Sequence, residues 1–126
     1  MAYTLPTYGL ALARGWLALI FLLNAVGIID QATPGQEMIA RGVPAPLVPP
    51  LMWSGRLLQC VAGLALLCGV QQRVAALALI VFLVPATLTA HPFWLDHTAA
   101  RQSQLINFMK NLAMVGGLLF VASVPD

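Results

Sequence analysis

Three polar residues interrupt the otherwise apolar stretch "INFMKNLAMVGGLLF", which runs from Ile106 to Phe120. Asn107 and Asn111 carry amides and Lys110 carries a cation, so all three can donate hydrogen bonds to the carbonyl oxygens of a bound molecule. Inside a bilayer such groups are costly unless they face a bundle interior or a wet cavity. They could equally join neighbouring helices, because an interhelical hydrogen bond contributes about 0.6 to 2 kcal/mol. The sequence leaves both alternatives open.

The composition indicates that this stretch belongs to a membrane protein. Of the 126 residues, 60% are hydrophobic and only 8% are charged, whereas a typical soluble domain has about 25% charged residues. So few charges cannot cover a water-facing surface. The net charge of +2 comes without a basic cluster, which argues against nucleic acid as a partner. We therefore predict an integral membrane protein of one domain, residues 1–126, in contact with the lipid bilayer.

Four apolar segments are long enough to cross a bilayer as helices, since each can be drawn with about 17 to 25 residues. Lipid offers the backbone no hydrogen-bond partner outside the segment itself, which favours helices. The predicted fold is an all-α, four-transmembrane-helix bundle with spans at 7–29, 50–70, 74–90 and 105–124. Between the first two spans, "PGQEMIARG" predicts a short interfacial helix ending at Gly42. The prolines that follow predict an extended lead into the second span. The first span lacks the features of a cleavable signal, and we expect it to be retained.

An even number of spans places both chain ends on one side of the membrane, here called side A. The first and third connections then lie on the other side, here called side B. Polar residues of all four spans gather near side B: Asn24, Arg56, Gln59, His91, Asn107, Lys110 and Asn111. We predict that these residues, with Trp94, line a ligand-binding pocket at side B. Lys110 can either turn inwards beside the face that carries Asn107 and Asn111 or extend towards side B.

Three residues near the membrane surfaces admit two interpretations each. Arg56 could anchor a ligand or form a salt bridge, for which three acidic residues lie on side B: Asp30, Glu37 and Asp96. Trp94 could anchor the protein at the membrane interface or cover a ring-shaped ligand. Arg14, on side A, could be an interface anchor or could donate to an internal amide or carbonyl.

The cysteines and histidines do not indicate a cofactor. Cys60 and Cys68 lie eight residues apart in one predicted helix, about 12 Å along its axis, which is too far for a disulfide. There is no Cys-x-x-Cys redox pair. His91, His97 and Asp96 have no further clear ligand nearby, so we interpret this segment as a hydrogen-bonded loop rather than a metal site. No intrinsic cofactor is predicted, because motifs for nucleotide, flavin or iron–sulfur binding are absent.

Taken in order, several segments resemble the DoxX family of small four-helix membrane proteins. "RGWLALIFLLNAVGIID" resembles the first helix of that family, "ARGVPAPL" its Gly-x-Pro lead into the second helix, and "GLALLCGVQQRVAAL" its Gly-rich second helix. "HPFW" followed by "INFMKNLAMVGGLL" is the most specific part, and the likeness covers nearly the whole chain. The chain departs from the family where Ala25 and Ile28 replace a frequent Gly and Lys, and where Gln59 replaces a frequent Glu.

The resemblance implies association with redox membrane complexes and, in some relatives, thiosulfate:quinone oxidoreduction. We therefore predict a small membrane subunit of an electron-transfer system that binds a quinone-like ligand or docks a redox partner at the side-B pocket. If it takes part in catalysis, we expect a quinone-linked oxidoreductase of several subunits rather than a self-sufficient enzyme. The alternative is a non-catalytic scaffold or assembly factor, in which the polar cluster only fixes helix packing. A homo-oligomer stays open, and we expect the bacterial inner (cytoplasmic) membrane as the location.

Overall fold

The computed structural model describes residues 4–28 and 32–124. Within these ranges the chain is all-helical, without a strand. Its elements are α1 (Thr4–Ala25), α2 (Ala32–Ala40), the 3-10 turn η1 (Ala45–Leu47), α3 (Val48–Cys68), α4 (Gln72–Ala90), the 3-10 turn η2 (Phe93–Leu95) and α5 (Arg101–Ser123). Each of α1, α3, α4 and α5 contains an apolar window long enough to cross a membrane. The predicted all-α bundle of four spanning helices is confirmed.

The helix bounds differ from the prediction most clearly before the second span. The prediction of an extended lead is wrong, because η1 and the first turn of α3 occupy the proline-rich segment, and α3 already begins at Val48. Pro49 fits this first turn because the N–H that it lacks would have no partner inside the helix. The short helix α2 is present where it was predicted. It ends at Ala40, and two residues later Gly42 has a φ of +92°, a left-handed conformation that favours glycine.

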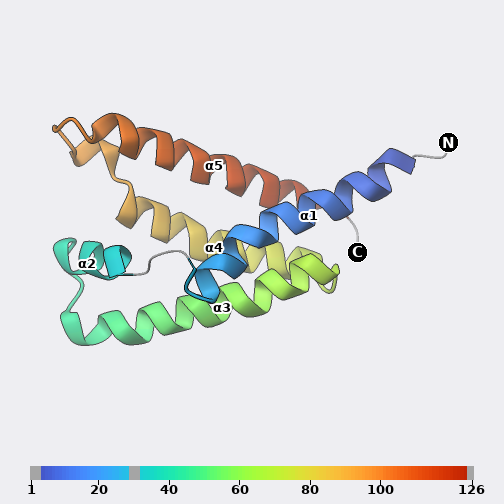
Figure 1. Ribbon diagram of the computed structural model, residues 1–126, viewed down its shortest axis with the longest axis horizontal. Coiled ribbons are helices and arrows are strands. Elements are labelled where there is room, and N and C mark those ends of the chain that lie inside the picture. The colour runs from blue at the N-terminus through green and yellow to red at the C-terminus, as the bar shows by residue number, and fades with distance from the viewer. Residues whose placement is uncertain (1–3, 29–31, 125–126) are drawn as a thin grey trace.

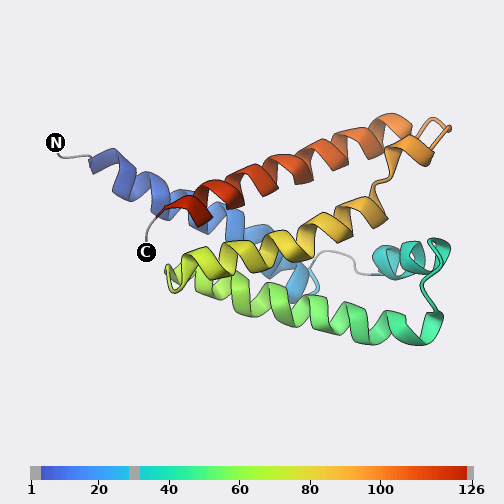
Figure 2. The same cartoon turned by 180° about the vertical axis from the view of Figure 1, so that it is seen from behind.

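The spanning helices are arranged as the assignment of sides A and B requires. α1 packs mainly on α3, α5 packs mainly on α4, and α3 and α4 pack against each other after a tight turn. Figures 1 and 2 show the start of α1, the α3–α4 turn and the end of α5 at one end of the bundle, which is side A. α2 and the α4–α5 connection lie at the opposite end, side B.

The tightly packed core lies mostly in the halves of α3, α4 and α5 nearest side A. Its buried residues are Ala18, Phe21, Ala62, Leu66, Ala75, Ala76, Leu79, Leu83, Leu118 and Val121. Small residues bring the helices close together, and a Cβ added at Gly63 would lie 3.0 Å from Leu22 Cδ2. Lipid chains are as apolar as these side chains, so close van der Waals packing holds the helices together rather than removal from water.

Large apolar side chains cover the outside of the bundle. Trp16 is 73% exposed, Val81 is 71% exposed and Phe120 is 67% exposed. An apolar surface of this extent would drive aggregation in water but suits contact with lipid. The protein is therefore surrounded by the bilayer along its four spanning helices.

Towards side B, α3 and α4 diverge, and α2 lies between their ends and contacts both (Figures 1 and 2). α4 contains Pro85, which has no N–H to donate to the carbonyl of Val81. In the following turn, Thr87 and Thr89 donate their hydroxyls to the carbonyls of Leu83 (2.7 Å) and Pro85 (2.9 Å). An internal proline and threonine bonds of this kind bend helices. Pro85 and the two threonine bonds therefore give a local reason why the side-B end of α4 diverges from α3.

Arginines lie at the C-terminal ends of all four spanning helices: Arg56 at α1, Arg14 at α3, Arg41 at α4 and Arg73 at α5. Arg56 donates through Nε and Nη2 to the carbonyl of Ala25, at 3.1 and 3.0 Å. The last carbonyls of a helix have no donor inside it and carry partial negative charge. Arg56, Arg41 and Arg73 donate to such carbonyls and therefore stabilise helix ends, whereas Arg14 lies beside the end of α3 and donates to the side chain of Gln72.

Candidate functional site

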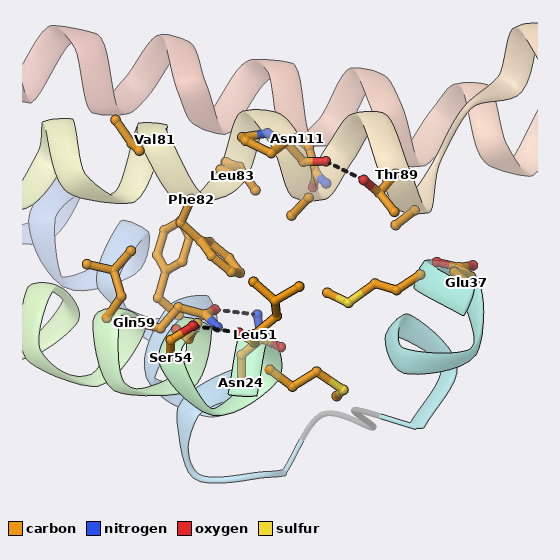
Figure 3. Close-up of a pocket in the computed structure, with 18 of the residues that line it drawn as sticks. Asn24, Glu37, Leu51, Ser54, Gln59, Val81, Phe82, Leu83, Thr89 and Asn111 are labelled. Atoms are coloured by element: carbon orange, nitrogen blue, oxygen red, sulfur yellow. Dashed lines mark hydrogen bonds between the residues drawn. The ribbon is translucent and has the colours of Figure 1, made fainter. Parts of the chain in front are cut away.

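A pocket of about 670 Å³ lies in the side-B half of the bundle, and all five helices contribute to its lining. Leu51 of α3 and Val81 of α4 both line it and are both exposed, so it opens between these two helices at the lipid-facing surface. Figure 3 shows Asn24, Gln59 and Asn111 along its walls and Glu37 at the edge formed by α2. Most other lining residues are apolar. Ligand sites typically have this size, about 300 to 1,000 Å³, and this composition.

Asn24 and Gln59 form a polar pair on the wall between α1 and α3. Asn24 Nδ2 donates to Gln59 Oε1 over 3.1 Å. Gln59 is only 2% exposed, and its Nε2 donates to the carbonyl of Gly55 over 3.2 Å. The amide of Gln59 has a second N–H, which can donate to a molecule in the pocket.

Asn111 forms the corresponding contact on the wall between α4 and α5. Its Nδ2 donates to Thr87 Oγ1 over 3.0 Å, and the Thr87 hydroxyl in turn donates to the carbonyl of Leu83. Asn111 lines the pocket, whereas Thr87 is buried behind it. The second N–H and the oxygen of the Asn111 amide are thus left for a ligand.

His91 follows the last residue of α4 and lines the pocket near its side-B end. Its Nδ1 lies 2.7 Å from Oε1 of Gln104 in the first turn of α5. An amide oxygen only accepts hydrogen bonds, so Nδ1 carries the hydrogen of the neutral ring and Nε2 presents a lone pair. With this contact, Nε2 of the neutral ring is a hydrogen-bond acceptor.

The short helix α2 covers the side-B end of the pocket and supplies Glu37 and Met38 to its lining. α2 is tied to both neighbouring helices. Arg41, next after its last residue, donates from Nε to the carbonyl of Thr89 on α4 over 3.4 Å. On the other side, a Cβ added at Gly35 would lie 3.0 Å from Sδ of Met52 on α3. Glu37 is the one carboxylate in the described lining.

Arg56 is not among the pocket-lining residues. Besides its two bonds to Ala25, its guanidinium lies 4.8 Å from the ring centroid of Trp53. Within the described ranges no ion pair joins Arg56 to Glu37 or Asp96, and Asp30 lies outside those ranges. The structure therefore pairs Arg56 with a helix terminus rather than with a carboxylate.

Trp94 also lies outside the pocket lining. Its ring packs edge-on against Phe93 and Phe108, with centroids 5.3 and 5.7 Å apart. It is 44% exposed at the side-B end of the bundle. This arrangement favours the interface anchor over a cover for a ligand.

Lys110 and Asn107 are the other two predicted site residues that do not line the pocket. Lys110 is exposed on α5, where its long side chain can extend towards side B. Asn107 is half-buried, and its side chain has no hydrogen-bond partner among the described residues. The structure thus brings four of the eight predicted residues together: Asn24, Gln59, His91 and Asn111.

The α4–α5 connection is a hydrogen-bonded loop, as its sequence suggests. Asp96 accepts from the hydroxyl of Thr98 at 2.6 Å and from its backbone N–H at 2.8 Å. These bonds, chiefly that of the hydroxyl, hold the pKa of the Asp96 carboxyl below its ordinary value. Nowhere in the described ranges do three His, Cys, Asp or Glu side chains come together as metal ligands would.

Sequence reasoning missed the contribution of α2 and the partners of the predicted amides. Glu37 was considered only as a partner for Arg56, although it is the one acidic residue of the predicted short helix. Thr87 has the spacing of a threonine that bonds back to its own helix, but nothing in the sequence indicates that Asn111 would reach it. Arg14 was left with two interpretations, and the structure pairs its Nη1 with Gln72 Oε1 at 3.1 Å.

In comparison with known protein families, the model of the DoxX family matches residues 9–92, from the first turns of α1 to just beyond the end of α4. The match stops before α5, so most of the part with the most specific resemblance, from Phe93 of "HPFW" through the segment that begins at Ile106, lies beyond it. No characterised protein and no solved structure matches the chain. With a match over more than half of its length and four membrane-spanning helices, the chain belongs to the DoxX family of multi-pass integral membrane proteins.

Proposed function

We propose that this protein is a small membrane subunit of an electron-transfer system and binds a quinone-like ligand in the side-B pocket. The observation that carries the proposal is the pocket itself, with about 670 Å³, mainly apolar walls and a few amide and imidazole groups. A membrane-soluble ring with oxygen substituents suits both the walls and the polar groups. The proposed location is the bacterial inner membrane.

The position of the opening supports a ligand that is dissolved in the bilayer. The pocket opens between α3 and α4, where the exposed lining residues are mainly apolar and Ser54 is the polar one. A lipid-soluble molecule can enter there without crossing water. Met52 and Met114 also line the pocket, and methionine adapts readily to ligands of irregular shape.

The remaining hydrogen-bond capacity of the lining supports a ring with oxygen substituents. Gln59 and Asn111 each keep one amide N–H after their contacts within the protein. Both can donate to ligand oxygens. The lining contains no cysteine, so the proposal assigns electron transfer to a redox partner that docks on this subunit.

A second candidate is a non-catalytic scaffold or assembly factor. It is favoured by the fact that the same amides join helices, with Asn24 and Gln59 linking α1 to α3 and Asn111 and Thr87 linking α5 to α4. Under this alternative the polar residues only fix helix packing.

Ligand binding to matched variants distinguishes the two candidates. Binding of a decyl-substituted benzoquinone to the detergent-purified protein can be measured by equilibrium dialysis. Asn111→Leu should weaken binding about 2- to 10-fold, which corresponds to the loss of one hydrogen bond. Lys110→Leu changes the adjacent residue outside the pocket and should leave binding unchanged.

A steric variant makes the test independent of hydrogen bonding. Ala86 lines the pocket, whereas Ala113 is exposed on α5 outside it. Ala86→Trp should fill the pocket and abolish binding, while Ala113→Trp should not. A wild-type protein that binds neither the quinone nor its reduced quinol form, or an Ala86→Trp variant that binds as tightly as wild type, would sink the proposal in favour of the scaffold.

A further inference from the structure

We propose that the pocket takes the reduced, hydroxyl-bearing form of its ligand, a quinol, in preference to the quinone. This inference rests on the proposed function and specifies the redox form that the same site recognises. The two forms differ in their hydrogen-bonding groups, and the pocket lining can distinguish them on this basis. A quinone oxygen only accepts hydrogen bonds, whereas a quinol hydroxyl can donate one as well as accept one.

The charge of the lining is the first argument. Glu37 lies at the α2 edge of the pocket (Figure 3), and the described lining contains no lysine or arginine. Arg41, one helical turn after Glu37, donates to the carbonyl of Thr89, and Arg56 donates to that of Ala25, so no ion pair to Glu37 is found among the described residues. An unpaired carboxylate repels the lone pairs of a carbonyl or a phosphate. It accepts a strong hydrogen bond from a hydroxyl.

The state of His91 is the second argument. Its Nδ1 hydrogen is held by Gln104 over 2.7 Å, so Nε2 can only accept a hydrogen bond while the ring is neutral. His91 and Glu37 belong to the same side-B end of the pocket, where α2 meets the end of α4. This end of the pocket therefore presents two hydrogen-bond acceptors, and a ligand that binds there should supply a hydrogen-bond donor.

The donors of the lining complete the argument. Gln59 and Asn111 lie along the walls and keep amide N–H groups for a ligand oxygen. A quinol can accept there with one oxygen and donate to Glu37 or His91 with a hydroxyl. A quinone satisfies the amides but offers no donor to the half-buried acceptors at the side-B end, which lowers its affinity relative to the quinol.

The test compares the two redox forms of one probe. Decyl-substituted benzoquinol and benzoquinone are each equilibrated with the detergent-purified protein by dialysis without oxygen, with chromatography to confirm the redox form. Wild type should bind the quinol about tenfold more tightly, or more. Glu37→Gln, which keeps size but removes charge, should reduce this preference.

His91→Asn provides the second variant, because the shorter amide can keep the contact with Gln104 but cannot reach the position of Nε2. It too should reduce the preference, while both variants retain the unfolding transition of wild type. Equal binding of the two forms, tighter binding of the quinone, or a preference that survives both substitutions would overturn this inference while leaving the proposed function intact. Binding of neither form would overturn the proposed function itself.

Discussion

The hydrogen bond between Asn24 and Gln59 offers a quantitative test of how the pocket walls are held. The two amides join α1 to α3 over 3.1 Å, and Gln59 is almost completely buried. Asn24→Leu and Gln59→Leu keep most of the side-chain volume, so the cost of a cavity stays small. Each single variant breaks the bond between the two side chains and should lower the free energy of unfolding by about 1 to 3 kcal/mol, with the larger loss for Asn24→Leu, which removes the donor to the buried Gln59.

The double variant isolates the contribution of the pair. Hydrogen bonds between membrane helices average about 0.6 kcal/mol and reach about 1.7 kcal/mol. The loss of unfolding free energy in the double variant should therefore be smaller than the sum of the two single losses, by an amount in this range. The coupling excludes effects that each side chain has by itself, such as the bond of Gln59 to Gly55.

Reversible unfolding in mixed micelles, followed by circular dichroism during an SDS titration, gives the four free energies that the cycle needs. Asn107→Leu is the matched control, because this half-buried asparagine has no side-chain partner among the described residues. It should cost no more than about 0.5 kcal/mol, as for substitutions without a specific contact. Additivity of the Asn24 and Gln59 variants within about 0.3 kcal/mol would refute the pairing. So would a loss in the control as large as that of Asn24→Leu.

Three further predictions concern helix ends, close packing and the loop. Arg56→Ala should lower the free energy of unfolding by about 1.5 to 3 kcal/mol, because it removes two charge-assisted hydrogen bonds. The exposed Arg73→Ala removes one and should cost less than about 1 kcal/mol. Equal losses in the same titration would contradict the comparison. Gly63→Ala should cost about 1 to 3 kcal/mol, because the methyl group would lie 3.0 Å from a leucine of α1. Gly116→Ala meets open space and should be neutral or stabilising, so similar melting temperatures for both variants would speak against tight α1–α3 packing. The lowered pKa of Asp96 means that its carboxylate contributes stability above the unfolded pKa of about 3.9, and that this is lost as the pH falls through the folded value. The difference in melting temperature between wild type and Asp96→Asn should therefore shrink below about pH 4, and a difference that stays constant down to about pH 2 would rule this out.

The sequence by itself determined the fold class and the side on which polar residues gather. Apolar segments of spanning length leave the backbone no choice but helix, and an even number of them places the first and third connections together. Asn24, Gln59, His91 and Asn111 could be assigned to one end of the bundle by their positions alone. Local signals also sufficed for the short helix α2, which is followed by a glycine with positive φ, Gly42.

The tertiary structure decided which of these residues face the pocket. Position along a helix follows from the chain, but the direction of a side chain depends on which neighbour packs against which face. Arg56 has the same depth as the pocket residues, yet it turns to the carbonyl of Ala25, because α1 ends beside α3. Lys110 is next to Asn111 in sequence and about 100° away on the helix, which is enough to place it on the outer face.

The pocket itself also follows from contacts between distant segments. It exists because α3 and α4 diverge beyond their packed halves and because α2 bridges the gap, held by Arg41 on one side and Met52 on the other. The hydropathy pattern of the sequence indicates the length and the polarity of each helix, but it does not indicate the angle between two helices. That angle is set by van der Waals packing of small residues near side A and by the proline and threonines of α4, and it depends on the fold as a whole.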